Sequence, residues 1–227
     1  MKWIIDLFTS TLGRKLLMGL TGLVLIMFLV VHLAGNLQLL KDDNGEAFNR
    51  YAEFMGHNAL IQLVSKANFG FIILHILISL FLTIKNRDAR GPEGYRGNAK
   101  KKSSIWASRN MGILGTIILI FLVIHLKDFW GESKFGDLKT TAYGDENYGD
   151  LYAQVVYWFG KGWYVALYVF CMCGLAFHLW HGFASAFQTF GWRHQKYTPI
   201  ITFVGKAFAI IVPALFAWIP LSLFFHL

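Results

Sequence analysis

Five long apolar segments divide this chain, and they restrict its fold more than any other feature. The segments run approximately over residues 15–40, 59–85, 106–127, 156–189 and 200–225. Each is long enough to cross a bilayer core of about 30 Å as a helix that rises about 1.5 Å per residue. Only 15% of the residues are charged, against about 25% in a typical soluble domain. We therefore expect an all-α membrane protein in which residues 1–227 form a single transmembrane domain, a bundle of five helices.

The charged residues are divided unequally between the two sides of this bundle. One side would hold the N-terminus, the loop 85–109, the turn 190–198 and Lys206, with 14 Lys and Arg against 3 Asp and Glu. The other side would hold the remaining 7 basic and 10 acidic residues, including the polar segment 128–152, which we expect to be an external loop. The positive-inside rule then places the N-terminus in the cytoplasm and the C-terminus outside. The basic excess needs no nucleic acid as a partner, and it offers a docking face to a cytoplasmic protein.

Four histidines lie in four of the apolar segments, at two matched depths. Counted from the cytoplasmic end of each helix, His32 and His125 lie roughly 25 and 28 Å deep, and we call them the outer pair. His75 and His178 lie roughly 15 and 17 Å deep, and we call them the inner pair. The two layers would be roughly 10 Å apart. An ionisable ring inside a bilayer is costly, so it usually has a partner or a function.

Two stacked b-type haems, each bound by one histidine pair, fit this pattern best. No CxxCH sequence is present, so such haems would be bound non-covalently. Zinc is disfavoured because neither layer holds further Cys, Asp or Glu ligands. For any single histidine, a hydrogen bond to a neighbouring helix is the alternative. His181 lies three residues after His178 and could compete with it as a ligand or contact a haem propionate, but we favour His178.

Small residues near the histidines would leave room for a flat porphyrin. They are Gly19, Gly22, Gly35, Gly112, Gly115, Gly174 and Gly182. Close packing between membrane helices explains several of these glycines equally well. From this set we take Gly22 and Gly115, together with His181, as candidate haem-pocket residues.

The sequence contains no motif of an enzyme that transforms a substrate. There is no GxGxxG, no Walker motif, no pattern of a catalytic triad and no sizeable soluble domain. We therefore assign no catalytic residue, and we expect any substrate chemistry to belong to another chain.

Five stretches of the sequence together resemble a known family. They are RKLLMGLTGLVLIMFLVVHLAGN, EAFNRYAEFM, ILHILISLFLTIKNRDAR, SRNMGILGTIILIFLVIHL and GLAFHLWHGFASAFQTFGW. They resemble the cytochrome b subunit of succinate dehydrogenase and fumarate reductase in its single-chain, five-helix, di-haem form, over about residues 14–192. The resemblance implies axial ligation by His32 and His125 in the haem far from the cytoplasm, and by His75 and His178 in the near one. In the family the last ligand lies four residues before a glycine, here Gly182, which selects His178 over His181.

The resemblance also implies a place in a respiratory complex of the bacterial cytoplasmic (inner) membrane. A partner flavoprotein subunit would oxidise succinate to fumarate, and an iron–sulfur subunit would relay the electrons to this chain. The two haems would then pass them to a membrane quinone, with menaquinone as a candidate. Fumarate reduction would use the same path in reverse. The resemblance leaves open whether the complex forms a dimer.

The quinone site is the least defined part of this prediction. Glu53 and His57 are candidates because they lie near the outer end of the second apolar segment, close to the outer layer; an ordinary solvated loop is the alternative. Two other functions compete with the whole assignment. One is a di-haem transmembrane cytochrome that works alone, and the other is a haem-free anchor or transporter, although the lack of internal repeats weakens transport.

Overall fold

The computed structural model describes residue 5, residues 8–90 and residues 106–226 of the chain. Five of its helices are long and apolar enough to cross a membrane. These spans are formed by α2 (Thr11–Asn36), α4 (Ala59–Arg90), α7 (Met111–His125), α10 (Gly162–Thr189) and α11 (Thr198–His226), and the third span continues past α7 as far as Phe135. The prediction of a mostly helical chain with five helices that could span a membrane is thereby confirmed.

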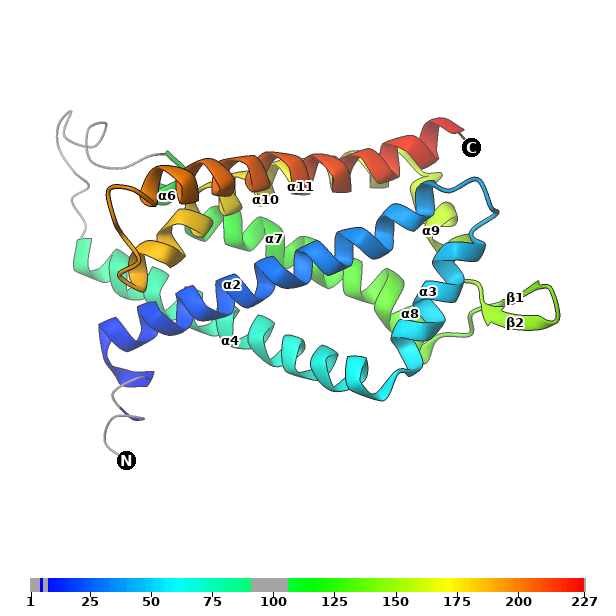
Figure 1. Cartoon of the computed structure of the whole chain (residues 1–227), viewed down its shortest axis with the longest axis horizontal. Coiled ribbons are helices and arrows are strands. Elements are labelled where there is room, and N and C mark those ends of the chain that lie inside the picture. The colour runs from blue at the N-terminus through cyan, green and yellow to red at the C-terminus, as the bar shows by residue number, and fades with distance from the viewer. Residues whose placement is uncertain (1–4, 6–7, 91–105, 227) are drawn as a thin grey trace.

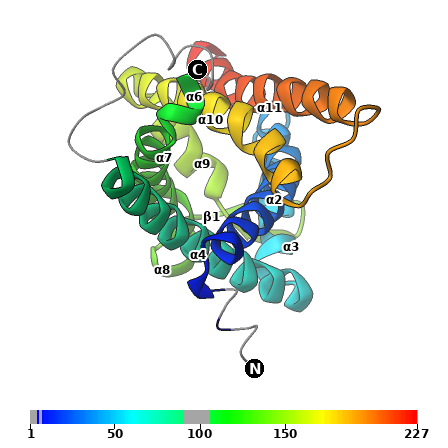
Figure 2. The same ribbon diagram turned by 90° about the vertical axis from the view of Figure 1, so that its left-hand side faces the viewer.

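Helix α10 lies at the centre of the packing. It contacts α11, α2 and α7, and α2 also packs against α4. Figure 2 looks along the bundle and shows the long helices arranged around its axis. Because the bundle has an odd number of spans, α2 begins at one end and α11 finishes at the other (Figure 1).

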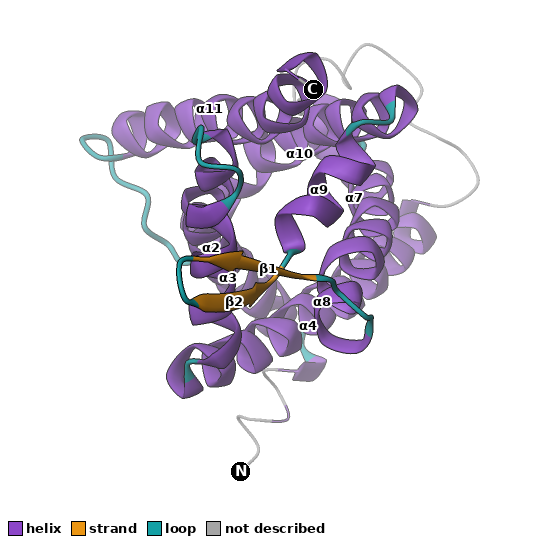
Figure 3. Ribbon diagram, turned by 90° about the vertical axis from the view of Figure 1, so that its right-hand side faces the viewer, coloured by secondary structure: helices purple, strands orange, loops and turns teal. Residues whose placement is uncertain are grey.

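Short elements cover one end of the bundle, which we call the hairpin end. They are η1 (Leu37–Leu40), α3 (Glu46–His57), the π-helical turn η2 (Leu126–Gly131), α8 (Glu132–Phe135), β1 (Thr140–Tyr143), β2 (Glu146–Gly149) and α9 (Leu151–Phe159). Strands β1 and β2 pair antiparallel, with Thr140 opposite Gly149 and Tyr143 opposite Glu146. Figure 3 shows this hairpin in front of the bundle. The segment 128–152, predicted as an external loop, is therefore largely ordered into these elements.

The opposite end, where α2 begins and α4 finishes, we call the basic end. Lys85 of α4 donates a hydrogen bond to the Thr11 hydroxyl (3.0 Å), and the Arg14 guanidinium lies 3.7 Å from the centre of the Phe81 ring. The short helix α6 (Trp106–Arg109) lies just before α7. Residues 91–105, which carry part of the predicted basic loop, lie outside the described residues.

The fourth apolar segment is not one helix over residues 156–189, as the hydropathy pattern predicts. Helix α9 finishes at Phe159, and α10 begins at Gly162 after an extended Lys161. The Lys161 ammonium lies over the rings of Tyr157 (3.7 Å) and Trp158 (4.1 Å), a cation–π arrangement that holds the break in place. An apolar run alone does not reveal such a break because both helices are apolar.

A buried amide ties the hairpin to helix α3. Asn49 is only 1% exposed. Its side chain donates to the Tyr143 hydroxyl and to Asp150 Oδ1, both at 3.0 Å, and accepts from the Tyr152 backbone N–H at 2.9 Å. A second contact between α3 and the hairpin is exposed to solvent. Tyr148 and Arg50 donate hydrogen bonds to the Glu146 carboxyl and lower its pKa. The hairpin is thus fixed against the bundle.

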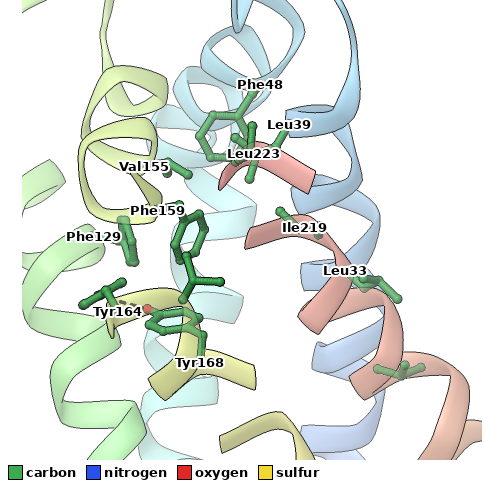
Figure 4. Packing of buried hydrophobic residues seen from close by; sticks show 12 residues of the cluster. Leu33, Leu39, Phe48, Phe129, Val155, Phe159, Tyr164, Tyr168, Ile219 and Leu223 are labelled. Atoms are coloured by element: carbon green, nitrogen blue, oxygen red, sulfur yellow. Dashed lines mark hydrogen bonds between the residues drawn. The ribbon is translucent and has the colours of Figure 1, made fainter. Parts of the chain in front are cut away.

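A cluster of buried apolar side chains also lies at the hairpin end (Figure 4). It includes Leu33 of α2, Phe129 of η2, Phe159 of α9 and Ile219 of α11. Since these residues come from four different elements, their packing fixes the ends of the long helices relative to one another.

Candidate functional site

The structure brings the two histidines of the outer pair together. His32 lies one turn before the end of α2, and His125 is the last residue of α7. Their ring centres are 5.6 Å apart, and the ring planes are nearly perpendicular, at 89°. Phe28 stacks on His32 and Phe121 stacks on His125, with centroid distances of 5.1 and 5.5 Å. Aromatic rings therefore pack against both histidines of the outer pair.

The structure also brings the two histidines of the inner pair together. His75 comes from the middle of α4 and His178 from the middle of α10, with ring centres 6.3 Å apart and an interplanar angle of 62°. The ring that faces His75 is thus that of His178, whereas His181 lies beside His178 on the same helix.

A fully buried threonine fixes the orientation of His75. Thr21 of α2 lies 2.9 Å from His75 Nδ1, and its hydroxyl donates to the carbonyls of Leu17 (2.9 Å) and Met18 (3.1 Å). Because the only hydroxyl proton of Thr21 is used on these carbonyls, its oxygen accepts a hydrogen bond from His75 Nδ1–H. The Nε2 lone pair of His75 then remains available to a metal.

The spacing of both pairs fits two imidazoles on opposite sides of one metal ion. With a metal–nitrogen bond of about 2 Å and a ring centre about 1.1 Å behind the nitrogen, the two centroids would lie about 6 Å apart. The measured values of 5.6 and 6.3 Å bracket that distance. Among the described residues, no group of three or more His, Cys, Asp or Glu could hold a metal ion. A haem iron needs only two such ligands, because the porphyrin supplies the rest.

One nitrogen of the inner pair is buried without a hydrogen-bond partner. It is Nδ1 of His178. Leaving a buried polar atom unpaired costs about 1–3 kcal/mol, so this nitrogen is available to a bound group. The residues present therefore fit a haem.

The glycines near the histidines fall into two groups. Gly19, Gly35, Gly112 and Gly174 lie against side chains of neighbouring helices, so that an added Cβ would meet them at 3.2 Å or less. These four serve close helix packing. By contrast, a Cβ on Gly22 would meet only the ring of His75, at 3.6 Å, and a Cβ on Gly115 or Gly182 would meet nothing within 4 Å. An added Cβ at the second group would therefore not crowd a neighbouring helix.

The two layers are further apart than the sequence alone suggests. Thr21, which contacts the inner pair, and His32 of the outer pair are 11 residues apart on α2, a rise of about 16 Å. On α10, Tyr168 contacts His125, and His178 follows 10 residues later, a rise of about 15 Å. The separation of roughly 10 Å predicted from the sequence was obtained by counting residues from the helix ends. That count is correct only if all helices begin at one level.

The proposed quinone residues line a polar cleft at the hairpin end. Glu53 and His57 are exposed on α3, and His57 Nδ1 lies 3.1 Å from Glu53 Oε1. They share a cleft of about 480 Å³ with Ser133 and Lys134 of α8, with Leu138 between α8 and β1, and with Gly149 of β2. Ser133 follows His125 by 8 residues of continuous helix, or about 12 Å. The cleft therefore lies near the outer pair.

Sequence reasoning missed the residues that support the histidines. They are Thr21 beside His75, and Tyr168, Tyr164 and Asp128 beside His125. The only signal for the tyrosines was their polarity within an apolar segment, spaced four residues apart so that both lie on one face of a helix. Nothing in the sequence pairs them with Asp128.

No protein-family model, curated protein or solved structure matches this chain. The assignment of a function therefore depends on the sequence motifs and the site geometry.

Proposed function

We propose that this chain is a di-haem cytochrome b that carries electrons through a membrane between a cytoplasmic iron–sulfur partner and a quinone. In this proposal it is the membrane-anchor subunit of a bacterial succinate:quinone oxidoreductase. The observation that carries the proposal is the presence of two histidine pairs at two levels of one bundle, both with the ring spacing of bis-imidazole ligation. The five stretches that resemble the family contain all four of these histidines.

The pairs have distinct tasks in this scheme. His75 and His178 would hold a haem toward the basic end, where an iron–sulfur subunit would dock, and His32 and His125 would hold one toward the hairpin end. A bound haem supplies a one-electron ferric/ferrous couple. Two histidine ligands leave no open position on the iron, so oxygen would not bind there. The chain holds and tunes the cofactors while the dehydrogenation takes place elsewhere.

The reaction balances across the complex. Succinate loses two electrons and two protons to give fumarate on the flavoprotein, and the quinone takes up two electrons and two protons to become a quinol. Glu53 and His57 are proton-accepting and proton-donating groups that line a cleft at the same end of the bundle as the outer pair. Their contact places a carboxylate beside an imidazole, a combination that can exchange protons with a quinone ring.

Haem content is the decisive measurement. We expect the purified wild-type chain to bind two haems b by pyridine haemochrome analysis. His32→Ala should remove or alter one haem, and His75→Ala should remove or alter the other. His226→Ala is the matched control, because it removes an exposed histidine of α11 that bonds to the Ser222 carbonyl of its own helix, and it should keep both haems.

Each alternative function gives a different result in the same preparations. A folded wild-type chain with one haem or none contradicts the proposal and favours an anchor or a transporter. Two haems without co-purifying flavin and iron–sulfur subunits favour a cytochrome that works alone. Glu53→Gln should suppress quinone turnover while both haems stay bound; unchanged turnover would place the quinone elsewhere.

A further inference from the structure

A chain of buried hydroxyl groups connects the outer pair with a buried carboxylate. His125 Nδ1 lies 3.2 Å from the Tyr168 hydroxyl, which lies 3.2 Å from the Tyr164 hydroxyl. Tyr164 in turn donates to Asp128 Oδ2 at 2.9 Å. Figure 4 shows the two tyrosines next to each other on α10. Tyr164, Tyr168 and Asp128 are 1%, 5% and 6% exposed, so water is largely kept from these bonds.

The carboxylate at the end of the chain sets the direction of every hydrogen bond in it. An ionised carboxylate only accepts, so the single proton of Tyr164 is directed to Asp128. The oxygen of Tyr164 must then accept from Tyr168, and the oxygen of Tyr168 must accept from His125 Nδ1–H. This order leaves the Nε2 lone pair of His125 available to a metal. It also directs the negative charge of Asp128 toward one of the two outer ligands.

Asp128 is anchored so that this direction is maintained. Its other carboxylate oxygen, Oδ1, contacts the ammonium of the exposed Lys127 at 3.0 Å. Its backbone carbonyl accepts from Gln154 of α9 at 3.1 Å. The π-helical turn η2 that begins at Leu126 places Asp128 beside α10, one turn beyond His125. A π-turn within a helix often marks a functional position.

We infer that Asp128, Tyr164 and Tyr168 form a relay that sets the redox potential of the outer haem through His125. This inference rests on the proposed function. A ligand imidazole that donates its second N–H toward a carboxylate is a stronger electron donor to the metal. It therefore favours the ferric over the ferrous state, which lowers the potential. Hydrogen bonds in series polarise one another in a dry environment, so a charge two tyrosines away can still act on the ring.

The relay is specific to the outer pair. In the inner pair, the corresponding nitrogen of His75 meets the hydroxyl of Thr21, whose proton is used on backbone carbonyls of its own helix. That arrangement orients the ring without connecting it to a charged group. A change in the relay should therefore affect one haem and not the other.

Spectroscopic redox titration of the two haems tests the relay. We expect Tyr168→Phe and Asp128→Asn each to shift the ferric/ferrous equilibrium of the outer haem toward ferrous by about tenfold, or 59 mV upward for a one-electron couple. The outer haem is the one that His32→Ala removes, and the inner haem should keep its potential. Glu132→Gln is the matched control, because it removes a negative charge four residues after Asp128 and outside the relay.

A double variant separates the relay from a simple effect of charge at a distance. If Asp128 acts through the tyrosines, Asp128→Asn should have little further effect in a chain that already carries Tyr168→Phe. Tyr164→Phe provides a second break in the relay should Tyr168→Phe lose its haem. Unchanged potentials in chains that bind both haems would overturn the relay alone, as would a full effect of Asp128→Asn in the double variant. A folded wild-type chain without haem would instead overturn the proposed function.

Discussion

At the scale of single residues, the histidine pairs depend on hydroxyl groups that do not stand out in the sequence. Thr21 and Tyr168 each accept a hydrogen bond from one histidine of a pair and thereby determine which ring nitrogen faces its partner. The histidines themselves were recognisable because ionisable rings are rare in apolar segments and lie at repeating depths. The threonine and tyrosine that support the histidines were not recognisable from the sequence. Both residue types are common in membrane helices, and the histidines that they contact are distant in the sequence.

Replacement of Thr21 by Val should weaken binding at the inner pair. The substitution keeps the shape of the side chain but removes the acceptor for His75 Nδ1–H, leaving a buried donor unpaired. Loss of a residue that supports a metal ligand typically lowers metal affinity by about 10–100-fold. We expect a loss of that order in haem affinity, measured by transfer of haem to an apoprotein acceptor, for the haem that His75→Ala removes.

Two further variants make the Thr21 experiment specific. Thr21→Ser keeps a hydroxyl acceptor and should bind haem as the wild type does. Thr116→Val removes a threonine hydroxyl that, on α7, bonds to the Gly112 carbonyl of its own helix, and it should also be neutral. Equal haem retention by Thr21→Val and the wild type would show that Thr21 does not support His75.

At the scale of elements, hydropathy predicted the long helices well and the short ones poorly. Burial of a long apolar helix in a bilayer is so favourable that length and composition suffice to find it. Helix α3 and the β1–β2 hairpin instead depend on particular contacts, such as those of Asn49 with Tyr143 and Asp150. Those contacts join residues about a hundred positions apart in the chain, so no local sequence pattern predicts them.

The crossing of α10 and α11 should be sensitive to a single methyl group. A Cβ added to Gly205 of α11 would lie 2.5 Å from Cδ1 of Phe183, which is itself buried in α10. Overpacking of this kind costs about 1–3 kcal/mol, and each kcal/mol lowers the melting temperature of a chain of this size by roughly 2–4 °C. We expect Gly205→Ala to melt earlier than the wild type by such an amount in a thermal unfolding assay in detergent.

Gly70 of α4 provides the control for this experiment. A Cβ at Gly70 would meet nothing within 4 Å, and Ala is the better helix former by about 1 kcal/mol. Gly70→Ala should therefore be neutral or slightly stabilising. If the two substitutions have the same effect, the close approach at Gly205 does not limit the packing of α10 on α11.

At the scale of the whole molecule, the placement of charged residues divides the bundle into two different ends. The basic end carries cations such as Lys15, Lys85 and Arg87, whereas acidic residues such as Glu46, Asp145 and Glu146 lie at the hairpin end. The sequence predicted this division because the loops between successive membrane spans lie on alternate sides of the membrane, so the charges of each loop can be assigned to one side. The level of the histidine layers was predicted less well, since it depends on where each helix begins and how it tilts.

The orientation of the chain can be measured by labelling single cysteines with a membrane-impermeant maleimide. The background would carry Cys171→Ala and Cys173→Ala, because Cys173 is exposed on α10. Ser133→Cys on α8 and Gln195→Cys in the turn between α10 and α11 place one exposed thiol at each end. Since positively charged loops stay in the cytoplasm, we expect intact spheroplasts to label at position 133 and not at position 195.

Permeabilised membranes complete the measurement. Position 195 should become reactive there to the same extent as position 133. That result would show that the thiol at position 195 is accessible and that the membrane protected it in intact spheroplasts. Labelling of position 195 in intact spheroplasts, with position 133 protected, would reverse the topology. The Glu53–His57 cleft would then face the cytoplasm, and the outer and inner histidine pairs would exchange their places in the electron path.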